Sequence, residues 1–424
     1  MNKRAPQYIR YMYSYPHKTA YRPFHPPVSL APYLKKAEGR QASLYFHIPF
    51  CRYKCGFCNL FSLQSCNKQL IDACLEAMRR QAVQLSLLTE NLHFGAFAIG
   101  GGTPLLLSAG QLNALFDIAA LFGGAAGSVP TSIETSPHYA DADALRLLKE
   151  KGVQRLSLGV QSFCPDELRQ IQRQTPVALV KKALDTVCQI NFPRFNIDLI
   201  YGIEGQTVES FLYSLRSALS YRPAELFMYP LYIRDGVRIS GQVNAKRLFD
   251  MYQAGRNELL QAGFKQTSMR RFVKNDAADP AYSCGDELMI SCGCGGRSYI
   301  GDLHCATPYA AAQPEIKSIL HRYIATTDFT VAGNGYLLTE EEIRRRYLIK
   351  NFLYYRGIDK ADYERRFENH FPDEIFKALS NKGLAEDKEG FVRLTDQGMA
   401  YSDDIGALFI SPAVQKLMDN YPLE

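Results

Sequence analysis

Three cysteines in one short segment are the residues of this sequence best suited to chemistry. Cys51, Cys55 and Cys58 have the spacing C-x3-C-x2-C and directly follow the apolar stretch 43–48. Three thiolates are one fewer than a closed iron-sulfur cluster takes, so a cluster bound here keeps one position for another ligand. The segment therefore predicts a metal centre with an open coordination site.

Two simpler interpretations of these cysteines are a zinc knuckle and ordinary buried thiols. A zinc knuckle takes a second pair of ligands, but no second cysteine pair follows closely, and His47 lies before the loop. Cys292 and Cys294 form a C-x-C segment, which supplies too few ligands for a second metal site, so both are predicted to be buried thiols. The others are predicted to be core or incidental residues: Cys66, Cys74, Cys164, Cys188, Cys284 and Cys305.

Further candidate residues are expected at the ends of short apolar strands. Six such strands, each followed by a helix-like pattern, are predicted over residues 43–48, 96–100, 131–136, 155–160, 195–200 and 225–233. Six strand-helix units in series predict an α/β fold with a parallel sheet. Glu134, Gln161 and Asp198 lie at or just past strand ends, and that rim is where active sites form in a barrel-like βα array.

A glycine run, Gly100, Gly101 and Gly102, ends the second predicted strand and precedes Thr103. Glycine lets backbone amides and carbonyls approach a ligand more closely than a side chain would permit. The run predicts either ligand contact or a plain tight turn. Glu134 adds a carboxylate that could hold a ribose diol or an ammonium group, or serve only as a polar surface residue.

Helical patterns dominate after about residue 235. Helices are predicted over 246–264, 339–355, 362–370 and 374–382, and a strand-turn-strand over 384–394. Thr339 and Glu342 have the spacing of a capping box, as have Ser108 and Gln111. The predicted organisation is an arm (1–40), a barrel (41–235), a connecting segment that completes the active-site region (236–335) and a mostly helical, winged-helix-like domain (336–424).

Composition and charge limit the functional classes. The 424 residues carry 49 basic and 43 acidic side chains, a net charge of +6, which is far from the clustered basic face of a nucleic-acid-binding protein. No apolar run approaches the roughly 20 residues of a membrane-spanning helix, and the N-terminus lacks the apolar core of a signal peptide. We expect a cytoplasmic protein with reduced cysteines that binds a small molecule, not nucleic acid or membrane.

The N-terminal segment 8–24 is rich in aromatic and basic residues. It contains five tyrosines beside Arg10, His17, Lys18 and Arg22. Aromatic rings with interleaved cations can form a stacking wall with carboxylate-binding tips. The arm is predicted either to fold over the barrel mouth and contact substrate, or to brace the outside of the barrel as an extended segment.

Four segments of the sequence carry a resemblance to a known family. They are Tyr-Phe-His-Ile-Pro-Phe-Cys (45–51), Gly-Gly-Gly-Thr-Pro (100–104), Arg-Leu-Ser-Leu-Gly-Val-Gln-Ser-Phe (155–163) and Asn-Ile-Asp-Leu-Ile-Tyr-Gly (196–202). Together they resemble the radical S-adenosylmethionine (SAM) enzymes, in particular the oxygen-independent coproporphyrinogen III oxidase-like group. The resemblance runs from about Tyr45 to Leu394 and implies a partial (β/α)6 radical SAM barrel.

The resemblance implies a 4Fe-4S cluster on the three cysteines and reductive cleavage of SAM to a 5'-deoxyadenosyl radical, with the electron from a donor such as flavodoxin or ferredoxin. Implied SAM contacts are Gly101, Gly102, Thr103, Glu134, Gln161, Arg173 and Asp198. Arg173 suits the methionyl carboxylate, because a guanidinium can donate two parallel hydrogen bonds. Tyr45 and Glu134 are the implied catalytic residues, with a core aromatic as the other interpretation of Tyr45.

Several activities occur within the resembling group. It includes the porphyrinogen oxidase, an oxidoreductase that abstracts hydrogen from its substrate, methyltransferases and cyclopropanases that use two SAM molecules, and a heme-binding chaperone. The second SAM of two-SAM members lies near residues that match 283–299 of this chain. The oxidase has a further cysteine just past its third cluster ligand, where this chain reads Asn59-Leu-Phe-Ser62.

Overall fold

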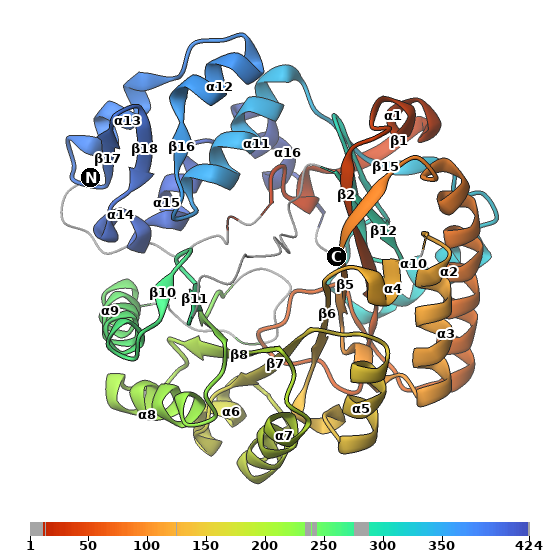
Figure 1. Ribbon diagram of the computed structural model, residues 1–424, viewed down its shortest axis with the longest axis horizontal. Helices are drawn as coiled ribbons and strands as arrows, with labels where there is room; N and C mark the ends of the chain where they lie inside the picture. Colours follow the sequence, from red (N-terminus) through yellow and green to blue (C-terminus); the bar gives the residue numbers. More distant parts are fainter. Residues whose placement is uncertain are drawn as a thin grey trace.

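Six parallel strands form the centre of a curved sheet in the computed structural model (Figure 1). They are β2 (Gln41–Ile48), β5 (His93–Gly101), β6 (Thr131–Thr135), β7 (Arg155–Gln161), β8 (Arg194–Tyr201) and β9 (Glu225–Pro230). The structure describes residues 12, 14–123, 125–233, 239, 244–274 and 288–422. All six predicted strands are confirmed, and with them the α/β fold with a parallel central sheet.

Shorter strands extend the sheet at both edges. Beside β2 lies the parallel strand β12 (Leu288–Cys292), followed by β13 (Arg297–Ile300), β14 (Leu303–Ala306), β15 (Val331–Leu337) and β1 (Arg22–Ser29), each antiparallel to the strand before it. Beside β9 lie the antiparallel strands β11 (Arg271–Val273) and β10 (Lys265–Gln266). The complete order is β1-β15-β14-β13-β12-β2-β5-β6-β7-β8-β9-β11-β10, so residues 288–337 share one sheet with the barrel strands.

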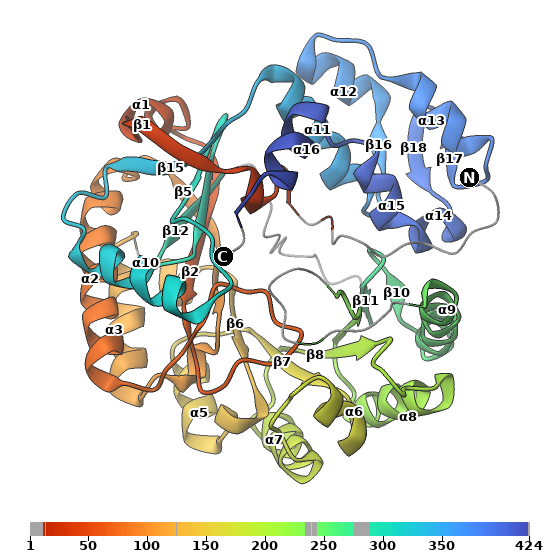
Figure 2. The same cartoon turned by 180° about the vertical axis from the view of Figure 1, so that it is seen from behind.

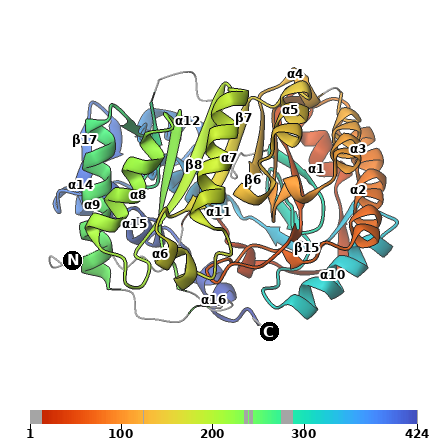
Figure 3. The same cartoon turned by 90° about the horizontal axis from the view of Figure 1, so that it is seen from below.

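Helices cover the outer face of this sheet (Figures 1 and 3). The longer ones are α2 (Lys68–Leu88), α3 (Ala109–Ala120), α5 (Ala142–Glu150), α7 (Val177–Ile190), α8 (Val208–Leu219), α9 (Ala245–Gln261) and α10 (Gln313–Ala325); α1 (Ala31–Lys36), α4 (Ala125–Ser128) and α6 (Pro165–Gln170) are short. Ser108 and Gln111 form the predicted capping box at the start of α3, which satisfies amide groups that have no partner in the first turn. Within the described ranges, no helix combines the length and apolarity required to cross a membrane.

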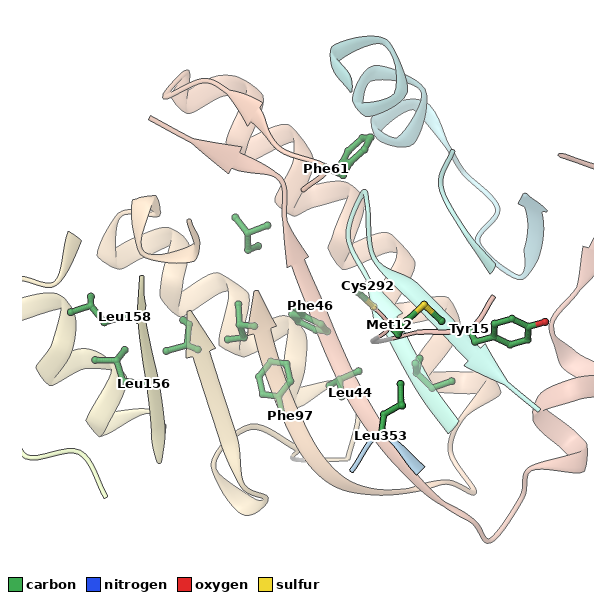
Figure 4. Close-up of a cluster of buried hydrophobic side chains, with 14 of the residues drawn as sticks. Met12, Tyr15, Leu44, Phe46, Phe61, Phe97, Leu156, Leu158, Cys292 and Leu353 are labelled. Atoms are coloured by element: carbon green, nitrogen blue, oxygen red, sulfur yellow. The ribbon is translucent and has the colours of Figure 1, made fainter. Parts of the chain in front are cut away.

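Alternating side chains divide each central strand between two environments. On β2, Leu44 and Phe46 are at most 1% exposed and belong to the main hydrophobic core, where Phe46 packs edge-on against Phe97 with ring centroids 5.0 Å apart (Figure 4). Tyr45 and His47, on the opposite face, line a central cavity. Because burying each large apolar side chain contributes roughly 1.5–3 kcal/mol, the core-facing residues can hold the sheet while the cavity-facing ones remain available for binding.

The C-terminal elements lie across the molecule from α2, α3 and α5 and next to α9 (Figure 2). This C-terminal domain contains α11 (Glu340–Phe352), β16 (Ile358–Asp359), α12 (Lys360–Phe367), α13 (Asp373–Ser380), β17 (Ala385–Lys388) and β18 (Phe391–Leu394), then α14 (Asp396–Ala400), α15 (Ser402–Ala407) and α16 (Pro412–Asp419). The three strands pair in the order β16-β18-β17. The predicted helices and strand-turn-strand are confirmed, whereas the winged-helix-like character of this region stays a prediction.

The N-terminal arm is anchored on this domain through Tyr15. Thr339 accepts a hydrogen bond from the Glu342 amide, but the predicted capping box is only half formed, because the Glu342 carboxylate does not return to the cap. It accepts hydrogen bonds from the Tyr15 hydroxyl and, at 2.6 Å, from the Ser411 hydroxyl. The Arg346 guanidinium donates to the Tyr15 carbonyl at 2.8 Å. The contact of Glu342 with Tyr15 and Ser411 therefore replaces the local capping contact with Thr339.

We expect Tyr15→Phe to lower the free energy of unfolding by about 1–3 kcal/mol, because the buried Glu342 carboxylate and the Ser411 amide would each lose a hydrogen-bond partner. Denaturant unfolding followed by circular dichroism measures the change. Tyr213→Phe is the matched control, since Tyr213 is 52% exposed on α8. Equal stability of the two variants would contradict the anchoring role of Tyr15.

Candidate functional site

The inner face of the curved sheet borders a cavity of about 660 Å³. The barrel strands, the cysteine loop, β13, the N-terminal arm and α11 all contribute to its wall. Every site residue expected from the sequence lines it: Tyr45, Cys51, Cys55, Cys58, Gly101, Gly102, Thr103, Glu134, Gln161, Arg173 and Asp198. Residues from position 45 to position 198 of the chain are thus brought to one space, because consecutive parallel strands present their carboxyl ends at the same edge.

The cysteine loop is closed by two short strands. In β3 (Phe50–Cys51) and β4 (Leu63–Gln64), Phe50 pairs with Leu63 and Cys51 pairs with Gln64. The Leu63 amide donates to the Pro49 carbonyl at 2.7 Å, and these bonds bring the two ends of the loop together. Residues 51–62 consequently form a closed loop whose three thiols all line the cavity.

The thiols have distinct polar neighbours. Arg173 donates from Nη1 to the sulfur of Cys55 at 3.2 Å, and the sulfur of Cys51 lies 3.6 Å from the Thr103 hydroxyl. Burial raises the pKa of Cys51 to about 11, and burial and the charge of Cys55 raise the pKa of Cys58. The thiols of Cys51 and Cys58 therefore favour the protonated form at neutral pH, and a bound metal would displace their protons, as it does from any coordinating thiol.

An iron-sulfur cluster suits this donor set better than a single ion. Among residues 12–422, as far as they are described, no group of three His, Cys, Asp or Glu side chains is arranged to hold one metal ion. In a four-iron cluster each cysteine binds a different iron, so the three sulfurs do not converge on one atom. Three thiols on one loop, facing a cavity and contacted by a guanidinium donor, fit a cluster with one iron accessible from the cavity.

Each glycine of the run faces a different neighbour across the strand. A Cβ atom on Gly100 would lie 2.9 Å from a carboxylate oxygen of Glu134, and one on Gly101 would lie 2.8 Å from the His47 ring. Gly101 also has φ 111°, in the region that favours glycine. The run is thus needed for close packing at the rim, where Glu134 lies against Gly100 and the cysteine loop lies against Gly102.

His47 fixes the direction of the Tyr45 hydroxyl. The imidazole is 5% exposed, and burial lowers its pKa to about 4, so the ring is neutral. Its Nε2 lies 2.9 Å from the Phe61 carbonyl, which can only accept, so the proton is assigned to Nε2. Nδ1 then accepts from the Tyr45 hydroxyl at 3.1 Å. His47 was not among the predicted site residues, although its spacing of two from Tyr45 on one strand is the signal for a shared face.

Two of the carboxylates in the cavity wall, Glu134 and Asp198, have raised pKa values. Burial, and then the nearby charge of Asp198, raise the pKa of Glu134 to about 7. Burial also raises the pKa of Asp198, although this carboxylate accepts hydrogen bonds from Asn196 at 2.8 Å and Ser157 at 3.2 Å. Glu134 can therefore change protonation near neutral pH, when a cationic or hydroxyl-bearing ligand enters.

Gln161 has an unusual backbone conformation. Its φ is 75°, and the pairing of β7 with β8 shifts register between Gly159 and Gln161. A Cβ on Gly159 would lie 2.9 Å from the Gln161 side-chain nitrogen, so the amide is folded over that glycine. Left-handed backbone at a non-glycine residue is costly, and such residues cluster at ligand sites.

Sequence reasoning missed a layer of charged residues in the wall. Arg155 donates to Glu225 at 2.9 Å, and Arg271 lies 3.2 Å from the other Glu225 oxygen. The alternation of side chains along a strand could have predicted them. Every second residue lines the cavity on β7 (155, 157, 159 and 161) and on β8 (194, 196, 198 and 200). Further basic residues in the wall come from outside the six strands: Lys18, Arg52, Lys54, Arg270, Arg297 and Lys350.

The N-terminal arm borders the cavity through Met12 and Lys18. His17 and Arg22, the other described basic residues of the arm segment 8–24, do not line it. The Arg22 guanidinium instead bonds backbone carbonyls, that of Thr19 at 2.9 Å among them. Of the tyrosine-rich stretch, residues 8–11 and 13 lie outside the described residues.

The remaining cysteines behave as predicted where they are described. Cys292 and Cys294 are fully buried, and burial raises the pKa of both thiols. Cys74 is buried, Cys164 and Cys305 are half-buried, and Cys66 and Cys188 are exposed; Cys284 lies outside the described residues.

Comparison with known proteins agrees with this geometry. Residues 45–218 match the model of the Radical SAM superfamily. The chain is 26% identical over 386 residues to oxygen-independent coproporphyrinogen III oxidase of Escherichia coli, covering 85% of this chain and 83% of that protein. It is 28% identical over 390 residues to heme chaperone HemW of Bacillus subtilis, covering 87% of this chain and 99% of that protein. The solved structure of the Escherichia coli oxidase, HemN, a radical SAM enzyme, superposes with a TM-score of 0.76 at 25% identity, over 90% of this chain and 92% of that one.

Gly102→Ala should impair cluster binding, because its Cβ would lie 2.4 Å from the Phe50 carbonyl oxygen and 3.0 Å from the sulfur of Cys51. We expect iron and sulfide content after anaerobic reconstitution to fall by more than half. Gly110→Ala is the control, since no atom lies within 4 Å of its added Cβ and alanine favours the helix there by about 0.5–1 kcal/mol. Full iron content in Gly102→Ala would show that the close approach of Gly102 to Phe50 and Cys51 is not needed for cluster binding.

Proposed function

We propose that this chain, whose residues 45–218 belong to the radical SAM superfamily, binds a 4Fe-4S cluster and SAM and uses them to remove hydrogen from a small organic molecule. As a whole it falls in the group that contains oxygen-independent coproporphyrinogen III oxidase and heme chaperone HemW. One observation carries the proposal: the thiols of one loop and polar groups from four separate strands line a single cavity.

The residues of the wall divide naturally between the two cofactors. Cys51, Cys55 and Cys58 would hold three irons of the cluster, whose fourth iron would face the cavity. Cluster and SAM together supply a 5'-deoxyadenosyl radical when an electron arrives. The SAM-binding residues would be Gly101, Gly102, Thr103, Glu134, Gln161, Arg173 and Asp198.

Tyr45 and Glu134 are the proposed catalytic residues. The Tyr45 hydroxyl is oriented by His47, and a Cβ on Gly100 would touch both that hydroxyl, at 3.1 Å, and Glu134, at 2.9 Å. The two polar groups thus lie side by side at the rim, where they can hold a proton or a ligand hydroxyl. The arm and the C-terminal domain both contribute to the cavity wall, and their contacts would limit the access of water to a reactive species there.

The reaction after SAM cleavage is proposed to be of the coproporphyrinogen oxidase type, with the electron from flavodoxin or ferredoxin. A two-SAM methyltransferase or cyclopropanase is the second candidate, because Met289, Gly295 and Arg297 from the relevant segment line the cavity. A heme chaperone is the third, because the similarity to HemW of Bacillus subtilis covers 99% of that protein.

Product analysis separates these candidates. Reconstituted protein is incubated anaerobically with dithionite and deuterated SAM, and products are identified by mass spectrometry. We expect 5'-deoxyadenosine and methionine, and loss of both when Cys51, Cys55 or Cys58 becomes alanine. S-adenosylhomocysteine in addition would favour methyl transfer, and heme uptake with little SAM cleavage would favour the chaperone. Protein devoid of iron and sulfide, or cleavage that survives the cysteine substitutions, would end the radical SAM proposal.

SAM affinity should increase as pH rises through about 7. The carboxyl of Glu134 is neutral below its pKa of about 7 and charged above it, and the charged form binds an ammonium or a ribose diol more tightly. Equilibrium dialysis of SAM against cluster-loaded protein at several pH values measures the effect. Glu134→Gln should weaken binding and flatten the profile, whereas Glu150→Gln, an exposed change on α5, should leave it unaltered. A sloping profile in Glu134→Gln would assign the titration to another group.

A further inference from the structure

Cationic groups from two other segments contact the cysteine loop, which also carries a buried lysine of its own. Arg173, which follows β7 and α6, donates to the sulfur of Cys55 at 3.2 Å. Lys54, inside the loop, is 5% exposed and donates to the Ala311 carbonyl at 3.1 Å. Lys18, from the N-terminal arm, donates to the Asn59 carbonyl at 3.1 Å. Asn59 directly follows Cys58, so the arm places a positive charge beside the third cluster ligand.

Lys18 is held in this position by more than one contact. It begins a 3-10 helix, Lys18–Ala20, and its ammonium lies 3.6 Å from the centre of the Tyr309 ring. The Tyr309 hydroxyl donates to the same Asn59 carbonyl at 2.9 Å. The Lys18 ammonium is attracted both by the face of the Tyr309 ring and by the Asn59 carbonyl oxygen. Removal of water from such a site strengthens the attraction. The ammonium is therefore a fixed charge at the cavity wall.

A fixed positive charge at this point favours negative charge on the loop. A 4Fe-4S core of charge +2 with three thiolates has a net charge of −1, and one added electron makes it −2. In a partly buried site, a neighbouring cation stabilises the more negative state more strongly.

We propose that Lys18 sets the reduction potential of the cluster, so that the N-terminal arm, by placing this ammonium on the Asn59 carbonyl, makes the cluster easier to reduce. The step is the transfer of one electron from a low-potential one-electron carrier of the flavodoxin or ferredoxin class, and no bond or proton changes with it. Lys18 acts through space and is a positioning residue. The inference rests on the proposed function, because it requires a cluster on the three cysteines.

An anaerobic redox titration monitored by electron paramagnetic resonance tests the proposal on the reconstituted full chain. Lys18→Met removes the charge and keeps the length of the side chain, whereas Lys18→Arg keeps the charge and the contact with Tyr309. We expect the ratio of reduced to oxidised cluster in Lys18→Met to fall at least tenfold at a fixed potential, a shift of about 59 mV for one electron. Lys18→Arg should stay within twofold of the unsubstituted protein.

Lys181→Gln, an exposed change on α7, controls for the loss of one net charge and should leave the ratio unaltered. An unchanged potential in Lys18→Met, or an equal fall in Lys18→Arg, would overturn the proposal. Iron content and 5'-deoxyadenosine formation separate this failure from that of the proposed function. A chain that binds iron and cleaves SAM but shows no dependence on Lys18 disproves only the role of the arm, whereas a chain without iron disproves both.

Discussion

The alternation of side chains along parallel strands is the constraint on which this molecule depends. Leu44 and Phe46 enter the core while Tyr45 and His47 enter the cavity, and a shift by one residue would exchange the two sets. The apolar set holds the strand in register, because it cannot leave the core without a large loss of free energy. The positions of the polar groups that the strands present to the cavity are therefore fixed by packing on the other side of the sheet.

Polar groups in the cavity are kept in different charge states by their neighbours. Burial alone would raise the pKa of Glu225, but Arg155 and Arg271 lower it overall, so this carboxylate stays charged. Glu134 has no direct ion pair in the described contacts, and its pKa rises to about 7. Glu225 thus serves as a permanent counterion for the arginines of the wall, whereas the protonation of Glu134 can change when a ligand binds. Separate environments for similar groups are a common means of assigning them different tasks.

Closure of the cavity depends on segments from the two ends of the chain. Asp403 of α15 accepts from Arg270 at 2.6 Å and from the Met12 amide at 3.3 Å, and Ser14 accepts from Arg297 at 2.9 Å. Such buried, charge-assisted contacts are strong only when their geometry is held, and here the arm, the barrel and the C-terminal domain hold it jointly. The packing of the arm against the barrel and the C-terminal domain therefore both closes the cofactor site and places a charge beside the cysteine loop.

The sequence by itself determined the local features of this protein. Six strands followed from apolar runs, the start of α3 from Ser108 and Gln111, and the donor set from Cys51, Cys55 and Cys58, because each depends on neighbours within a few residues. Only the tertiary structure decided which distant groups meet. Glu342 leaves its local cap for Tyr15, and Lys18 reaches Asn59, since long-range contacts form only where the packed elements bring the partners together. The spacing of residues along the sequence does not determine which distant residues are in contact, so only the folded structure defines these contacts.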